Sequence, residues 1–389
     1  MRELLALFEQ VSSTFWPGVV NHLWQTTILA AMIYGLMLLV RNSPARVRYR
    51  LWLVAAAKFA IPATVFALIF SRLGIFYRTE GAPAGSQLIT KLAEPFGVKA
   101  TNVMISAVAD DSYQGQLFSA LTVIWLIGCG AFLINWLRRR SEIQRAMLRS
   151  REVRVGREFE MVERVRAQLG LSRSVTVMLS PDNIEPGVWQ TVRPVILLPE
   201  SVVRELDDEE LQAVIIHELA HVERCDNILA NSHRILACIF WFHPIVWLIN
   251  RKLISEREQA CDERVVEIGG SPSAYAASIL KIVRSCSGRK LAGFTGATAG
   301  SNLQKRIEDI LRQRRQRSVS IWHRALEYSL AAAVLAGSAW IGYTSHAQVA
   351  VCRQTEISNQ SATEKVAPAS LPSKNQARDN QRDSNGGDP

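Results

Sequence analysis

The sequence predicts a multi-pass α-helical membrane protein with four spans and a cytoplasmic α+β domain between the third and fourth span. Three observations lead to this prediction. Apolar residues make up 48% of the 389 residues, which is high for a soluble chain, and they gather in four long stretches. Arginines concentrate at particular ends of these stretches. Between the third and fourth stretch the apolar runs become short and alternate with charged segments, as in a folded domain.

The four stretches are each close to the ~20 apolar residues that a bilayer-spanning helix needs. They cover residues 19–40, 51–70, 117–137 and 325–343. The first begins too far from residue 1 for a typical cleaved signal peptide, and no small-residue cleavage site follows it. We therefore expect a three-span membrane region over residues 1–137 and a fourth transmembrane helix within residues 325–347.

Basic residues give the expected orientation, because cytoplasmic loops carry an excess of Lys and Arg. Arginines follow the first stretch, follow the third at 138–140 and precede the fourth at 312–324, whereas the 71–116 loop has few basic residues. We therefore expect both termini and the 71–116 loop outside, with the 138–324 region in the cytoplasm. Residues 348–389 are rich in Ser, Asn, Gln and Asp, which predicts a disordered extracytoplasmic tail.

The composition also excludes some classes of protein. The formal net charge is +10, but most of it serves as orientation signal, and no basic stripe with interleaved aromatic residues is present. Direct nucleic-acid binding is therefore not expected. The six cysteines are scattered and form no CxxC pair, so neither a disulfide framework nor a Cys-rich zinc site is expected.

Short elements follow one another in the cytoplasmic region. Residues 158–169 have the pattern of an amphipathic helix, and residues 175–179 and 195–198 have that of short strands. Pro194 and Pro199 bracket the second strand, which favours a place at the edge of a sheet. An edge strand can pair with an extended peptide.

The segment HELAH at 217–221 carries the chemistry. Asp207 is expected to N-cap its helix, with Glu210 completing a capping box. His217 and His221 are four residues apart and share one helix face, so both ring nitrogens can reach one metal ion. Glu218 lies beside that face and can take a proton from a metal-bound water. The alternative is a chance match within an amphipathic helix.

A catalytic zinc usually has a third protein ligand. The extended HExxHxxGxxH pattern fails because residue 227 is Asn. The best candidate is Glu258, because its helix begins near Pro244, after the turn of a predicted helical hairpin, and can fold back against the motif helix. Asp262, four residues later on the same face, can accept the remaining ring N–H of a ligating His.

Other assignments stay open at this point. His233 and His243 compete as third ligands, although His233 would lie about 18 Å past His221 on a continuous helix. The acidic residues around Glu258 also fit an ordinary solvated helix face. Arg264 and His233 are candidates for stabilising an oxyanion.

Several segments together resemble the membrane metallopeptidases of the BlaR/MecR antirepressor type. They are HELAH with Arg224 and Asp226, WFHPIVW at 241–247, EREQACDE at 256–263, RPVILLP at 193–199 and RYRLWL at 48–53. The resemblance covers roughly residues 15–345. It implies a gluzincin-type zinc metallopeptidase domain over residues 138–324, with His217, His221 and Glu258 as zinc ligands and Glu218 as the catalytic base.

The resemblance also implies a function. It is that of a signal-transducing endopeptidase of the bacterial inner (cytoplasmic) membrane, which cleaves a cytoplasmic regulator such as a transcriptional repressor. The sequence after residue 343 contains no SxxK motif, so a C-terminal penicillin-binding sensor domain is not expected. A membrane quality-control protease and a non-catalytic receptor or scaffold remain as alternatives, and an oligomer stays open.

Overall fold

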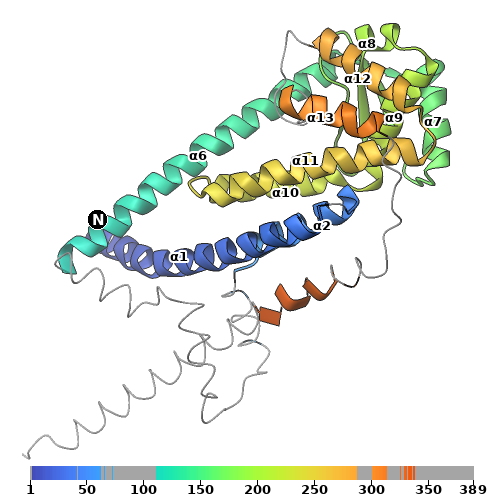
Figure 1. The fold of residues 1–389 in the computed structure, drawn as a ribbon. Coiled ribbons are helices and arrows are strands. Elements are labelled where there is room, and N and C mark those ends of the chain that lie inside the picture. Colours follow the sequence, from blue (N-terminus) through green and yellow to red (C-terminus); the bar gives the residue numbers. More distant parts are fainter. Residues whose placement is uncertain are drawn as a thin grey trace, which may run out of the picture.

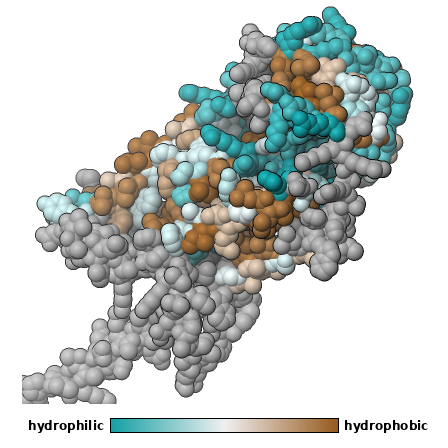
Figure 2. Space-filling view, viewed as in Figure 1, coloured by the Kyte–Doolittle hydropathy of each residue, from teal (hydrophilic) through white to brown (hydrophobic). Residues whose placement is uncertain are grey.

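The computed structural model describes residues 2–41, 43–62, 111–286 and 300–312, with scattered positions in 65–72 and 325–337. Long helices lie side by side in one region, and a small sheet with shorter helices forms the other (Figure 1). Apolar surface gathers over the long helices, whereas the sheet end is mainly hydrophilic (Figure 2). The combination of long apolar helices with an α+β region, expected from the sequence, is therefore present, and its strands form a small mixed sheet.

Two helices among the described residues are long and apolar enough to cross a membrane. They are α1 (Arg2–Leu39) and the Gly115–Arg149 part of α6 (Asp111–Arg149). Many of their large apolar side chains are exposed, which suits contact with lipid rather than with water. The N-terminal ends of α1 and α6 lie together, where Trp16 Nε1 donates to Thr122 Oγ1 at 3.0 Å.

The remaining membrane expectations are only partly described. The second stretch corresponds in part to α2 (Ala45–Ala60), whose apolar side chains pack against α1 and α11. Nearly all of the 71–116 loop, most of the fourth stretch and the 348–389 tail lie outside the described residues. The division of the chain into four spans and a separate 138–324 domain therefore remains a prediction.

The predicted helical hairpin is confirmed. It consists of α10 (Asp226–Ile239) and α11 (Pro244–Glu267), with Pro244 in the first turn of the second helix. The hairpin lies between α6 and the α1–α2 pair (Figure 1). Its tip reaches the middle of the long helices, because Trp125 Nε1 donates to the Ile239 carbonyl at 2.7 Å and the His22 and Phe240 rings are 5.7 Å apart.

The sheet has the strand order β1-β2-β4-β3. Its strands are β1 (Arg151–Val153), β2 (Thr176–Ser180), β3 (Gly187–Trp189) and β4 (Val195–Pro199). Strands β2 and β4 are parallel, and the other two pairs are antiparallel. The expectation of an edge strand at 195–198 is wrong, because β4 lies between β2 and β3 and is buried along its length. Its prolines stand at the ends, where they leave the interior N–H groups free to pair, and the Pro194 carbonyl accepts from Thr176 N.

Helix α9 (Asp208–Glu223) runs through the core beside this sheet. The predicted capping box is confirmed: Glu210 N donates to Asp207 Oδ1 and Asp207 N donates to Glu210 Oε2, both at 2.9 Å. Nearly all of its residues from position 210 to 222 are buried, so the helix is held on all sides. Helices α7 (Arg157–Gln168), α10, α11 and α12 (Pro272–Cys286) pack against it. Helices α8 (Glu200–Glu205) and α13 (Gly300–Leu311) pack in turn against α12.

We expect Gly128→Ala to lower the thermal midpoint of the detergent-solubilised full-length protein. A Cβ at Gly128 would overlap the Trp241 ring, which is held by a 3.3 Å hydrogen bond to the Trp125 carbonyl and by stacking on Phe132. Overpacking costs roughly 1–3 kcal/mol, more than the roughly 1 kcal/mol that Ala gains over Gly in a helix.

The matched control is Gly130→Ala, where a Cβ meets nothing within 4 Å. This variant should keep or slightly raise the midpoint. Equal midpoints for the two variants would mean that the hairpin tip does not pack closely on α6.

Candidate metal centre

Two helices bring three potential metal ligands together. Helix α9 supplies His217 and His221, and α11 packs against α9 and supplies Glu258. One nitrogen of each His and a carboxylate oxygen of Glu258 lie within 4.8 Å of one another. All three residues are buried, with Glu258 only 3% exposed. The residues that the sequence singled out as zinc ligands therefore form one compact cluster.

The geometry of this cluster fits a divalent cation. His217 Nε2 lies 3.5 Å and His221 Nε2 lies 4.0 Å from the Glu258 carboxylate. Ligands about 2.0–2.2 Å from a tetrahedral zinc lie about 3.3 Å apart, so the spacing is nearly right. His221 Nε2, Glu258 Oε2 and Glu218 Oε2 are buried without a hydrogen bond among the described residues. A cation would satisfy the first two, and a water bound to it would satisfy Glu218.

His217 is oriented by a chain of hydrogen bonds from α11 and α12. Its Nδ1 lies 2.7 Å from the Tyr275 hydroxyl, which donates to Asp262 Oδ1 at 2.6 Å. Asp262 was expected to accept the His217 ring N–H directly. Its Oδ1 lies 3.3 Å from Nδ1, but the hydrogen bonds run through the Tyr275 hydroxyl between them. Because Tyr275 donates to Asp262, the network assigns the His217 proton to Nδ1 and leaves Nε2 to face the cation.

His221 is oriented by an aspartate, Asp226. Its Nδ1 lies 2.8 Å from Asp226 Oδ2, which leaves Nε2 to face Glu258. Asp226 reaches this position because α9 ends at Glu223 and Cys225 adopts a left-handed conformation, with φ 55°, before α10 begins. The chain thus turns back at the end of the motif helix.

The competing candidates do not join the cluster. His233 lies in α10, and His243 N-caps α11, where its Nε2 is 3.4 Å from Thr27 Oγ1. Neither belongs to a metal-ligand group among the described residues. Arg264 forms ion pairs with Glu223 and Glu267 instead of facing the cluster. Cys261 is fully buried under His221, with Sγ 3.4 Å from Nδ1.

The charges of the cluster are strongly coupled. Burial alone would raise the pKa of Glu258, but the nearby His217 ring and the positive charge of Arg257 hold it well below its usual range. Burial alone would lower the pKa of His217, but the nearby carboxylates of Asp262 and Glu258 raise it to about 10. A cation bound here would oppose this effect, because a ligating imidazole must be neutral.

Arg306 connects α13 to the site. Its guanidinium pairs with both oxygens of Asp262, at 2.9 and 2.8 Å, and lies 4.0 Å from Glu258 Oε2. Although burial opposes ionisation, this pairing holds the pKa of Asp262 below its usual range. Arg306, Tyr275 and the role of Asp226 were not foreseen, because their place beside the motif depends on contacts between distant segments.

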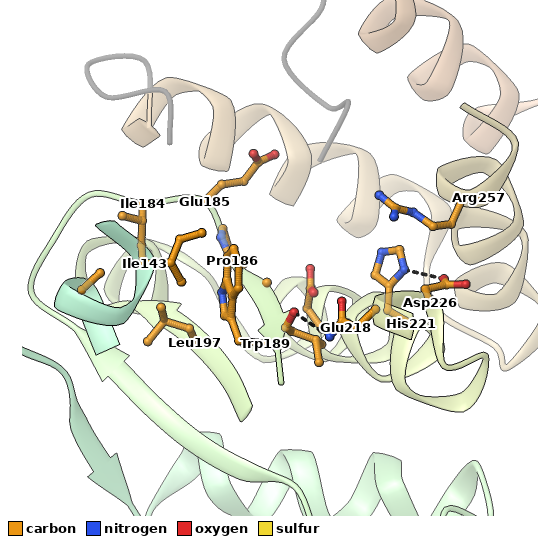
Figure 3. Close-up of a pocket in the computed structure, with 14 residues that line it drawn as sticks. Ile143, Ile184, Glu185, Pro186, Trp189, Leu197, Glu218, His221, Asp226 and Arg257 are labelled. Atoms are coloured by element: carbon orange, nitrogen blue, oxygen red, sulfur yellow. Dashed lines mark hydrogen bonds and ion pairs between the residues drawn. The ribbon is translucent and has the colours of Figure 1, made fainter. Parts of the chain in front are cut away.

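A cleft passes beside the metal centre. Figure 3 shows Glu218 between two groups of side chains that line it: His221, Asp226 and Arg257 on one side, and Trp189 with Pro186 on the other. A second hollow, lined by Glu185, Pro186, Glu218, Glu258 and Arg306, lies next to it. Glu218 therefore faces two hollows that share Glu185 and Pro186, just before β3.

This combination of helices and site matches a known family. The family model described as BlaR1 peptidase M56 matches residues 18–310, well over half of the chain. The chain belongs to this peptidase family. The match extends from α1 to α13 and includes every residue of the metal centre. The BlaR/MecR-type resemblance inferred from the motifs is confirmed.

Individual relatives agree with the family. The methicillin resistance MecR1 protein of Staphylococcus aureus is 26% identical over 203 residues, which cover 49% of this M56 family member and 33% of the relative. The regulatory protein BlaR1 of Bacillus licheniformis is 23% identical over 158 residues, 41% of this chain and 26% of the relative. A protease HtpX homologue of Gemmatimonas aurantiaca is 28% identical over 158 residues, 32% of this chain and 56% of the relative. This chain therefore spans only about a third of the length of the MecR1 protein.

We expect Asp226→Asn to weaken metal binding about 10–100-fold. The Asp226 carboxylate orients the His221 ring and makes that ring a more basic ligand, and the variant loses both effects. Competition with a chromophoric chelator on the purified full-length protein measures the affinity. The matched control is Asp208→Asn, which removes an exposed carboxylate from the first turn of the motif helix. Unchanged affinity in Asp226→Asn would exclude His221 Nε2 as a ligand positioned by this contact.

Proposed function

We propose that this M56 family member is a membrane-embedded zinc endopeptidase that transmits a signal by cleaving a cytoplasmic regulatory protein, such as a transcriptional repressor. The observation that carries the proposal is the buried cluster of His217, His221 and Glu258. Glu218 lines the cleft beside it, and its Oε2 has no hydrogen bond within the described part of the chain. Two imidazoles, one carboxylate and a neighbouring free carboxylate are what metal-assisted peptide hydrolysis requires.

The chain's own residues account for the proton transfers. Zinc at this site would supply Lewis-acid chemistry by making a water acidic and polarising the scissile carbonyl. Glu218 takes the proton from the attacking water and delivers it to the leaving amine nitrogen. Burial raises the pKa of Glu218 despite the opposing effect of His217 and His221, which strengthens the carboxylate as a base. Asp226 and the Tyr275–Asp262 pair keep the two imidazoles in one orientation.

The cleft supports an endopeptidase rather than a small-molecule hydrolase. It runs beside β3, an edge strand of the sheet, and an extended peptide can pair with such an edge. Asn227 Nδ2 donates to the carbonyls of Val188 and Gln190, both at 3.1 Å, which fixes β3 against the start of α10. A polypeptide lying along β3 would pass directly over Glu218.

The rest of the proposal concerns the membrane. We place the protein in the bacterial inner membrane with four spans, both termini outside, and the metal centre on the cytoplasmic side with residues 138–324. The two apolar helices and the relationship to MecR1 and BlaR1 support this placement. The similarity to BlaR1 of Bacillus licheniformis, which is named as a regulatory protein, supports a signalling role.

A second candidate is a membrane protease without a dedicated regulatory substrate, as in quality control. The similarity to HtpX homologues, which are named as proteases, favours it. Both candidates use the same chemistry. A non-catalytic receptor is disfavoured, because the site keeps two imidazoles, a carboxylate ligand and a general base together.

We expect Glu218→Gln to retain the metal and to lose proteolysis by a factor of at least about 100, because only the general base is removed. His217→Ala should lose both metal and proteolysis. Metal content is measured on purified protein, and cleavage by comparing protein N-termini in cells that express each variant. Unchanged cleavage in Glu218→Gln would overturn the enzymatic proposal.

The same comparison separates the two candidates. One or a few new N-termini that depend on Glu218 and map to a regulator are expected from the signalling peptidase. Cleavage of many membrane proteins, with no dominant substrate, would contradict the signalling role and support the quality-control protease.

A further inference from the structure

A large cavity lies between α6 and the α10–α11 hairpin. Its volume is about 770 Å³, within the ~300–1,000 Å³ range of ligand-binding pockets. Residues of α2, α6, α10 and α11 line it, together with Trp189 of β3. The proposed hydrolysis of a peptide at Glu218 does not use this cavity.

The end of the cavity towards the hairpin tip is apolar. Phe132 and Trp136 of α6 face Trp247 of α11, with the Phe132 and Trp247 rings 5.4 Å apart. Leu53 of α2 and Leu236 of α10 complete this wall. Phe132 and Trp136 belong to the apolar stretch at 117–137, so this end lies at the level expected for lipid chains.

The other end is strongly basic. Among the described residues, four arginines and one carboxylate, that of Glu142, line the cavity. The arginines are Arg139, Arg140, Arg234 and Arg257. Arg139 lies seven residues, about 10 Å, beyond Phe132 on α6. Arg139, Arg234 and Arg257 come from three different helices and line the same cavity. Like charges brought together in this way favour an anionic partner.

The basic end adjoins the metal centre. Ile143, Trp189 and Arg257 line both this cavity and the cleft that contains Glu218. Arg257 is 6% exposed and donates to Glu258 Oε1 at 3.0 and 3.3 Å. One guanidinium therefore contacts both the cavity and a residue of the candidate ligand set.

We propose that the cavity binds an acidic phospholipid of the cytoplasmic leaflet. Its acyl chain lies along the apolar wall between α6 and the hairpin, and its phosphate pairs with Arg139, Arg234 and Arg257. Charge and apolarity both match, because basic pockets between membrane helices on the cytoplasmic side bind anionic headgroups. The phosphate competes with Glu258 for Arg257, so the lipid composition of the membrane changes the electrostatics of the metal centre.

The test measures lipid binding and is independent of proteolysis. The full-length protein in neutral detergent is titrated with phosphatidylglycerol or phosphatidylcholine, and bound lipid is counted by native mass spectrometry. We expect phosphatidylglycerol to bind at least about tenfold more tightly. The Arg139→Gln/Arg234→Gln double variant should lose at least about tenfold of that preference, whereas Arg139→Lys/Arg234→Lys should retain most of it.

Two controls separate the cavity from general attraction to a basic surface. Arg138→Gln removes a neighbouring arginine of α6 that does not line the cavity, and it should bind phosphatidylglycerol like the wild type. Ala57→Trp fills the cavity from α2 and should reduce binding of both lipids. Inorganic phosphate should not displace the lipid, because it lacks the acyl chain.

Three results would overturn the proposal. The first is an equal loss in Arg138→Gln and in the double variant, which would indicate non-specific attraction. The second is undiminished lipid binding by Ala57→Trp. The third is displacement by inorganic phosphate alone, which would make the arginines a site for a free anion.

Discussion

The burial of charge beside the motif helix is the constraint on which the rest of this structure depends. Glu218, Glu258 and Asp262 are all buried around the metal centre. Buried carboxylates without compensating positive charge would strongly destabilise the folded state. Arg257 and Arg306 supply part of the compensation. A divalent cation supplies the remainder in the proposed enzyme, so the helices that surround α9 are arranged as much around charge as around apolar packing.

Local patterns in the sequence predicted much of the site, and the reason is physical. The capping box at 207–210, the HELAH spacing and the proline that opens α11 are each set by contacts within a few residues. The approach of Glu258 also followed, because a short hairpin forces its second helix back over what precedes it. Tyr275 and Arg306 were missed, because Tyr275 lies 58 residues along the chain from His217 and Arg306 lies 44 residues from Asp262. The place of β4 was misjudged because proline at the end of a strand removes no interior hydrogen bond.

The hairpin makes the membrane helices and the peptidase interdependent. Residues of α1, α2, α10 and α11 share one apolar cluster, and the sheet with α9 and α12 forms another. Helix α11 belongs to both regions: its N-terminal half packs in the first cluster, and its C-terminal half carries Glu258 and Asp262. A boundary drawn at the end of the third apolar stretch therefore divides the sequence, but it does not divide the packing.

Helix α11 has a mechanical consequence. It runs for 24 residues with no glycine and with proline only at its start, so it has no hinge of its own. Glu258 stands about 21 Å along this rod from the tip. Ligand geometry tolerates a displacement of about 0.5 Å, and a tilt of only about 1.4° at the tip produces that displacement over such a length. A slight tilt of α11 caused by the surrounding helices can therefore move the Glu258 carboxylate into or out of alignment with His217 and His221.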